Sequence, residues 1–273
     1  MTSVTPKPIR IGAVSYLNSK PLIEGLPELL PGAELLLDYP SRLADDLSAG
    51  LLDVALIPSV ECFGDEGYRI VSDACVATRG PVLSVKLYSR VPIPEIRRVA
   101  LDAGSRTSAA LVVILLAEQF GLHPERQPLP MGASVDATDA DAILLIGDRA
   151  IHPPAEQFAE TWDLGERWTN WTGLPFVFAV WAARRDADVS TIEFAFQQAR
   201  DLGLQRLHEI AERESALLGI SPQSAYDYLR NNLCFRMGPA EQRGLKRFGE
   251  LAAKQGLVTM VRGRGGVMGG TEG

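Results

Sequence analysis

The sequence has few cysteines and no run of positive charge. Cys62, Cys75 and Cys234 lie far apart and form no CxxC pair, which argues against a disulfide framework and against a zinc site. The 273 residues carry 27 basic and 34 acidic side chains, a net charge of -7, without the Lys/Arg cluster that binds nucleic-acid phosphates. We therefore expect no metal and no nucleic-acid partner.

Long hydrophobic runs and familiar catalytic motifs are also missing. No stretch of about 18 apolar residues occurs, and the first 17 residues do not resemble a secretory signal, so we expect a cytoplasmic protein without a membrane partner. The chain has no GxGxxG, Walker, HExxH or GxSxG motif, and no cofactor is expected. His123, His152 and His208 follow none of the predicted strands, so each is interpreted as a surface or structural residue.

Short apolar segments alternate with helical patterns along the chain. This β-α-β order is typical of parallel sheets with helices on their faces, and it starts twice, which indicates two α/β units. The main predicted strands are residues 9–15, 53–59, 97–102 and 141–147. From Val189 onward the pattern is helical, with Ser190, Ser221 and Gly238-Pro239 as predicted helix starts.

Two extended segments, residues 80–95 and 172–184, lead into and out of the second unit and predict a double hinge. We therefore predict an α/β protein of two lobes with a ligand cleft between them, beside the carboxyl ends of the strands. The predicted boundaries are residues 1–88 plus 185–260 for lobe 1, 89–184 for lobe 2, and 261–273 for a flexible, glycine-rich tail.

Residues 101–120 predict an anion site. A short strand runs into Ser105, Arg106, Thr107 and Ser108 and then directly into an amphipathic helix. The first N–H groups of a helix have no intrahelical acceptor, and the helix dipole adds positive potential at the same end. A carboxylate or phosphate is the expected ligand, and the alternative interpretation is an ordinary serine N-cap beside an exposed arginine.

Other polar side chains fall at the carboxyl ends of predicted strands. Ser15, Tyr16 and Asn18 form a donor-rich turn after the first strand, and Ser59 ends the predicted strand 53–59. Ser84 lies in the segment that crosses between the units, where one face of the strand should border the cleft. These residues are candidate ligand contacts, although a turn punctuated by Asn and Pro is the simpler interpretation of the first group.

Five motifs occur in order within residues 15–181: SYLNSKPL, DVALIPSVE, SRTSAAL, ILLIGDRAI and DLGERWTNWTGLPFVFAVW. With them the chain resembles, over roughly residues 9–260, the chorismate dehydratase family of the futalosine route to menaquinone. The resemblance implies a type II periplasmic-binding-protein-like fold, which agrees with the double hinge. It also implies a hydro-lyase reaction in which chorismate loses water to give 3-[(1-carboxyvinyl)oxy]benzoate.

The resemblance also suggests roles for residues. Asn18, in the SYLN motif, is expected to fix the reacting geometry or to bind the departing hydroxyl. The expected carboxylate binders are Ser84, Ser105, Arg106, Thr107 and Ser108, with a solvent-facing Arg106 as the alternative. We expect the substrate's own enolpyruvyl carboxylate to take the proton, with Glu61 or Asp148 as the alternative base. Outside that alternative, we interpret Asp148 as structural.

Three other kinds of protein share parts of this pattern. The first is a non-catalytic binding protein for a small anion, since the same fold mostly serves solute receptors. The second is the sister enzyme of the pathway, a dihydroxynaphthoate synthase, which we expect to differ at the SYLN turn and to need a base such as His. The third, the sensing domain of a regulator, would need DNA-binding helices. A homodimer is one hypothesis for the assembly.

Overall fold

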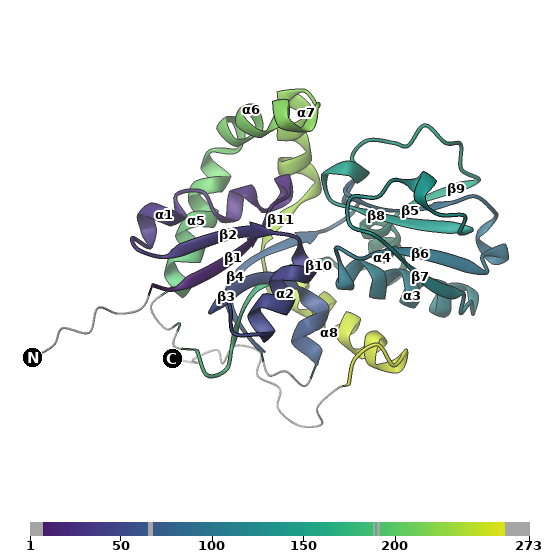
Figure 1. Cartoon of the computed structure of the whole chain (residues 1–273), viewed down its shortest axis with the longest axis horizontal. Helices are drawn as coiled ribbons and strands as arrows, with labels where there is room; N and C mark the ends of the chain where they lie inside the picture. Colours follow the sequence, from purple (N-terminus) through teal and green to yellow (C-terminus); the bar gives the residue numbers. More distant parts are fainter. Residues whose placement is uncertain (1–7, 65–67, 188, 190–191, 260–273) are drawn as a thin grey trace, which may run out of the picture.

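Two β-sheets, each at the centre of one lobe, organise the chain (Figure 1). The computed structural model describes residues 8–64, 68–187, 189 and 192–259. The first sheet has the order β11-β4-β10-β3-β1-β2, with β1 (Arg10–Val14), β2 (Glu34–Asp38), β3 (Val54–Pro58), β4 (Tyr68–Thr78), β10 (Phe176–Arg184) and β11 (Cys234–Arg236). The second has the order β7-β6-β8-β5-β9, with β5 (Val85–Ser89), β6 (Arg98–Asp102), β7 (Glu125–Leu129), β8 (Ala142–Ile146) and β9 (Glu160–Asp163).

Helices cover these sheets, and short turns connect them to the strands. The first lobe carries α1 (Leu26–Leu29), α2 (Pro40–Ser48), α5 (Glu193–Gln205), α6 (Leu207–Leu218), α7 (Pro222–Asp227) and α8 (Pro239–Lys254). The second carries α3 (Arg106–Phe120) and α4 (Leu164–Thr172). The shorter elements are η1 (Leu17–Leu22), η2 (Ser59–Phe63), η3 (Ile93–Glu95), η4 (Val135–Ala137), η5 (Asp148–Ala150) and the π-helical η6 (Tyr228–Asn232).

The central strands are apolar on both faces. Every residue of β3, VALIP, and of β8, AILLI, is buried, as expected where a sheet is covered on both sides. β1 pairs in parallel with β2 and β3, and β6 pairs in parallel with β7 and β8. The predicted β-α-β order of both units is therefore confirmed.

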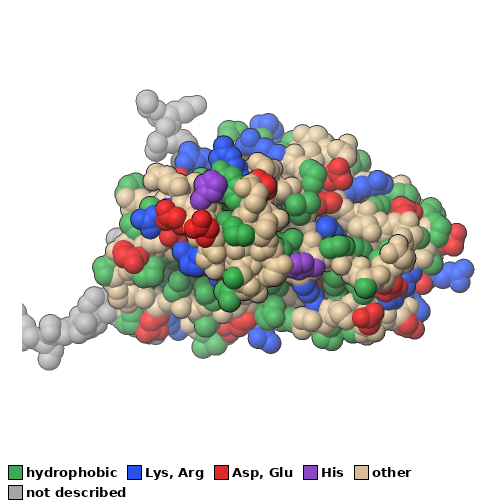
Figure 2. All heavy atoms as spheres, turned by 90° about the horizontal axis from the view of Figure 1, so that it is seen from above, with side chains coloured by type: hydrophobic (Ala, Val, Ile, Leu, Met, Phe, Trp, Pro, Cys, Tyr) green, Lys and Arg blue, Asp and Glu red, His purple; other side chains and the backbone are tan. Residues whose placement is uncertain are grey.

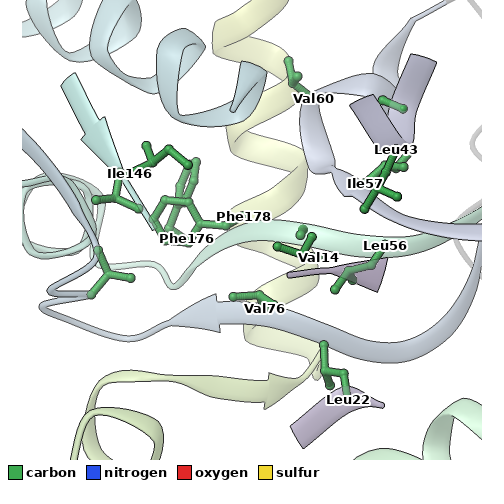
Figure 3. Close-up of a cluster of buried hydrophobic side chains, with 14 of the residues drawn as sticks. Val14, Leu22, Leu43, Leu56, Ile57, Val60, Val76, Ile146, Phe176 and Phe178 are labelled. Atoms are coloured by element: carbon green, nitrogen blue, oxygen red, sulfur yellow. The ribbon is translucent and has the colours of Figure 1, made fainter. Parts of the chain in front are cut away.

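The apolar core continues from one lobe into the other. Figure 3 shows Val14 and Val76 of the first sheet near Phe176 and Phe178 of β10, with Ile146 of the second sheet close to them. Aromatic rings strengthen this region, since Trp168 of α4 packs edge-on against Phe176 at 5.2 Å between ring centroids. The two lobes therefore meet over a packed surface at the hinge.

Sheet membership differs from the predicted lobe boundaries at both crossings. β5, most of which we assigned to lobe 1, belongs to the second sheet. β10, which we assigned to lobe 2, lies in the first sheet between β3 and β4 and is antiparallel to both. The apolar pattern locates a strand but not its partners, because pairing is decided by contacts far apart in the sequence. The crossings are residues 79–84 and 173–175.

The helices after Val189 pack on the first lobe, as predicted. α5 contacts β4, and α8 contacts β10. Ser221 caps α7 by accepting a hydrogen bond from the Ser224 N–H at 3.0 Å, and Gly238 precedes Pro239 at the start of α8. The predicted start at Ser190 and the predicted tail, residues 261–273, lie outside the described residues.

In Figure 2 acidic and basic side chains are interspersed on the face that is visible. Within the described ranges, no helix has both the length and the apolar character needed to cross a bilayer.

Candidate functional site

A cavity of about 40 Å³ lies where the lobes meet. It adjoins the carboxyl ends of β1, β3 and β8, where the ligand cleft was predicted. Its wall consists of Val14, Tyr16, Asn18, Pro40, Pro58, Val76, Val82, Ser84, Val85, Ser105, Ser108, Ile146, Gly147, Phe178 and Ala179. Five predicted site residues are therefore brought together here: Tyr16, Asn18, Ser84, Ser105 and Ser108.

Asn18 is positioned by a tightly held turn. It lies in η1, directly after β1, and the Asp148 carboxylate accepts the Leu17 N–H at 3.0 Å and 3.3 Å. The buried Ser19 hydroxyl donates to the carbonyl oxygens of Val14 and Tyr16. Because Asp148 belongs to the second lobe, the conformation of this turn depends on contact between the lobes.

Helix α5 supports the same turn from behind. A Cβ on Gly203 would lie 2.1 Å from the Pro21 carbonyl oxygen, a distance that no side chain can occupy. Glycine at this position lets α5 pack directly against the backbone of η1. The turn that carries Asn18 is therefore held between α5 and the Asp148 carboxylate.

The amino end of α3 opens onto the cavity. Ser105 is the N-cap residue, and its hydroxyl oxygen accepts the Ser108 N–H at 3.3 Å and lies 3.0 Å from the Ser108 hydroxyl. Both side chains are buried, and both line the cavity. The cavity therefore combines two serine hydroxyls with the positive end of a helix of 15 residues.

Ser84 approaches the cavity from the crossing segment. It is 1% exposed, and the Tyr228 hydroxyl donates a hydrogen bond to its Oγ at 2.8 Å. Leu83, the residue before it, has a φ of 61°, a left-handed conformation that a leucine adopts only at a cost. The Asp163 carboxylate holds this conformation by accepting the N–H groups of Val82 and Leu83 at 2.9 Å and 2.7 Å.

Tyr16 belongs to the cavity wall and contacts the second lobe. Its ring lies over Gly147, where a Cβ would be 2.6 Å from two ring carbons, and Gly147 has a φ of 73°. The ring also packs edge-on against Tyr39 at 5.9 Å between centroids. Burial raises the pKa of Tyr16 well above its ordinary value, so its phenol stays protonated.

The remaining predicted residues are not part of the cavity wall. Ser59 is fully buried and donates to the Val177 carbonyl at 2.7 Å, and Thr107 accepts the Val60 N–H at 3.1 Å. Arg106 points outward and forms ion pairs with Asp45 at 2.5 Å and Glu61 at 3.1 Å.

Ser15 is half-buried, is not part of the cavity wall, and donates its N–H to the Asp38 carbonyl. Ligand binding by these four residues, Ser15, Ser59, Arg106 and Thr107, stays a prediction, without support from their positions.

Two carboxylates lie behind the cavity wall. Asp102 is 2% exposed and pairs with Arg149. Its carboxylate accepts the N–H groups of Gly104 and Ile146 at 2.9 Å and 3.2 Å. Burial raises the pKa of Asp102. Burial also raises the pKa of Asp148 to about 6. Both are held by backbone N–H groups, which agrees with the structural interpretation of Asp148.

The polar groups of the wall are hydroxyls and one amide. Such groups donate hydrogen bonds to an anion but are weak bases. His123, His152 and His208 are all exposed, as predicted. In the ranges that the structure describes, no group of three or more His, Cys, Asp or Glu side chains is arranged to hold a metal ion.

Sequence reasoning missed Tyr228, which contacts Ser84 from the far end of the chain. Its only local signal is a helical pattern between Ser221 and Phe235, which reveals nothing about its partner.

Comparison with solved structures identifies the fold. Protein AF1704 from Archaeoglobus fulgidus aligns with a TM-score of 0.74 at 18% identity, over 93% of this chain and 99% of that one. The alkanesulfonate-binding protein SsuA from Xanthomonas axonopodis pv. citri gives 0.63 at 15% identity, over 94% and 96% of the two chains. The Candida albicans CA3427 product, described as having the generic periplasmic binding protein fold, gives 0.61 at 15% identity over 90% of each chain. The predicted periplasmic-binding-protein-like fold is confirmed.

Sequence comparison identifies the family. The chain is 34% identical over 262 residues to a protein named chorismate dehydratase from Thermus thermophilus, which covers 89% of this chain and 95% of the relative. A family model described as menaquinone biosynthesis matches residues 9–254. This match includes both lobes and every residue of the cavity wall. The chain therefore belongs to the menaquinone biosynthesis family.

Proposed function

We propose that this protein is a chorismate dehydratase that supplies 3-[(1-carboxyvinyl)oxy]benzoate to menaquinone biosynthesis. The observation that carries the proposal is the likeness to the Thermus thermophilus chorismate dehydratase, which extends over nearly the full length of both chains. The cavity adds support from chemistry, because it presents neutral hydrogen-bond donors and a helix amino end.

Chorismate carries two carboxylates, and the cavity has two donor groups. Ser105 and Ser108 at the start of α3 are suited to one carboxylate, because the helix dipole adds to their hydrogen bonds. Ser84 and Asn18 lie in other parts of the wall and are suited to the other polar groups of the substrate. A dianion is thus held without a net positive charge on the protein.

In the proposed reaction, the first bond to break is the C–H bond at the ring carbon that bears the enolpyruvyl ether. Its electron pair spreads through the neighbouring double bond into the ring carboxylate, where clamped donors stabilise it. The adjacent hydroxyl then leaves and, with the proton, forms water, while the ring becomes aromatic. Because the wall groups are weak bases, we assign proton removal to the substrate's enolpyruvyl carboxylate. The protein contributes positioning, which is worth several kcal/mol of the barrier.

We infer that the lobes separate to admit this substrate. The cavity, of about 40 Å³, is small for a six-membered ring that carries two carboxylates. Polar contacts that join the lobes include the Asp148 carboxylate on the Leu17 N–H and the His152 Nε2 at 2.8 Å from the Leu218 carbonyl. We assign these contacts to a closed state of the two lobes.

Incubation of the purified protein with chorismate, without added metal or cofactor, tests the proposal. The expected product has lost 18 mass units, the mass of one water, and absorbs as an aromatic compound. Binding without turnover would instead favour an anion-binding protein, a role that many proteins of this fold have. No binding would favour the sister dihydroxynaphthoate synthase.

The assignment of the base needs a second experiment. A chorismate analogue that lacks the enolpyruvyl carboxylate is expected to bind without losing water. Elimination from this analogue at a rate comparable to that of chorismate would contradict substrate assistance. A cytoplasmic location and a homodimer stay predictions, and sedimentation of the purified protein tests the latter.

A further inference from the structure

Tyr228 connects two parts of the cavity wall that belong to different elements. It is 3% exposed and begins η6, a π-helical turn that follows α7. Its hydroxyl donates to Ser84 Oγ at 2.8 Å. The nearby Asn18 side chain acts on the same phenol as a hydrogen-bond donor would, because it partly offsets the rise in the Tyr228 pKa that burial causes. π-Helical turns are rare in proteins, but those that exist are often found at functional sites. Such a turn moves a side chain out of the register of the helix.

The direction of these hydrogen bonds follows from the available protons. A phenol has one proton, and Tyr228 gives it to Ser84. Its oxygen can therefore only accept from Asn18, whose Nδ2 carries two protons. Ser84 has accepted one bond, so its own proton is available to a ligand in the cavity. The three side chains thus form a chain of donors that runs from Asn18 through Tyr228 to Ser84, and each bond strengthens the next.

Two unfavourable backbone conformations position the side chains of this hydrogen-bonded series. The left-handed backbone of Leu83, held by Asp163, places Ser84 at the cavity, and the π-helical turn places Tyr228 behind it. Burial raises the pKa of Tyr228 far above its ordinary value, so the phenol keeps the proton that it donates.

We infer that Tyr228 is a positioning residue for the proposed dehydration: its hydroxyl orients the Asn18 amide and turns the Ser84 proton toward the substrate. This inference rests on the proposed function. Tyr228 acts through its two neighbours and is not part of the cavity wall.

The variant Tyr228→Phe removes the hydroxyl and keeps the ring. Its matched control is Tyr226→Phe, because Tyr226 lies two residues earlier and stacks on His208 at the surface, away from the cavity. We expect kcat for chorismate to fall by about 10- to 100-fold in Tyr228→Phe, with KM changing less than about three-fold. The control should retain the kcat of the unmodified protein.

Ser84→Ala separates a positioning role from a general loss of structure. If Tyr228 acts through Ser84 and Asn18, the loss of kcat in the double variant should be smaller than the product of the two single losses, because the part that acts through Ser84 is counted only once. The inference would be overturned if the double variant lost kcat by the full product of the two single losses. It would also be overturned if Tyr228→Phe had the same kcat as its control.

A spectroscopic measurement distinguishes this inference from the proposed function. The side-chain amide signal of Asn18, identified by its absence in Asn18→Asp, should shift in Tyr228→Phe and stay in place in Tyr226→Phe. An unmodified protein that leaves chorismate intact would refute the proposed function, while the shifted amide would still support the orienting contact. An unchanged amide signal in Tyr228→Phe would refute the positioning role, whatever the activity.

Discussion

Replacing Asp148 by asparagine is expected to stabilise the protein at neutral pH. The Asp148 carboxylate is largely buried between the lobes and accepts the Leu17 N–H, and burial raises its pKa from 3.8 to about 6. The asparagine oxygen can accept the same N–H bond, so the substitution removes a charge and keeps the contact. The difference between the two proteins therefore reports the free energy of ionising this group in the folded state.

The sign and the size follow from the shift. A carboxyl group with a raised folded pKa favours folding below pH 3.8, and this contribution is lost as the pH rises through about 6. A shift of about two pH units corresponds to about 3 kcal/mol at 1.36 kcal/mol per unit, an upper bound for a group that solvent partly reaches. The variant should match the unmodified protein near pH 4 and exceed its stability by up to about 3 kcal/mol at pH 7.5.

Urea unfolding of both proteins at several pH values from 4 to 8 measures this difference, since contributions from all other groups cancel. Asp136→Asn, at an exposed position, reports the effect of the same substitution without burial. A stability difference that stays constant over this range, or that favours the unmodified protein at high pH, would refute the reasoning.

Two further substitutions test the turn that carries Asn18. Asn18→Asp is expected to lower kcat for chorismate by about 100-fold or more, because it places a negative charge beside a dianion. The melting temperature should stay nearly unchanged. Activity assays and melting curves of both proteins measure these two effects. Gly203→Ala should destabilise the fold by about 2 kcal/mol or more, since its Cβ would lie 2.1 Å from the Pro21 carbonyl oxygen. Gly80→Ala, where nothing lies within 4 Å, is its control in urea unfolding, and equal midpoints would contradict the argument.

Much of the fold could be predicted because its central strands are unusually uniform. The apolar runs of β3 and β8 are buried along their whole length, so composition alone marks them as covered strands. The same uniformity explains why the sequence did not assign β10 to the first sheet. An apolar strand fits the centre of either sheet, and only pairing with β3 and β4, distant in sequence, assigns it to the first.

The candidate site could be predicted in part, for a geometric reason. Ser105 and Ser108 are three residues apart and face the same side at the start of α3, which is the side of the cavity. Arg106 and Thr107 lie between them and face other neighbours, so the helical spacing itself could have separated the two pairs. Tyr228 had no such signal, because its contact with Ser84 exists only in the folded chain.

The central position of β10 has a consequence for synthesis on the ribosome. Strands β5 to β9 come from one continuous stretch of chain and make a complete sheet, so the second lobe can form as soon as it emerges. The first sheet cannot close at that time, because β3 and β4 are joined only through β10, which is made after the whole second lobe. The lobe that is translated first is therefore the one that is completed last, and its exposed strands β3 and β4 must wait for the strand that fits between them.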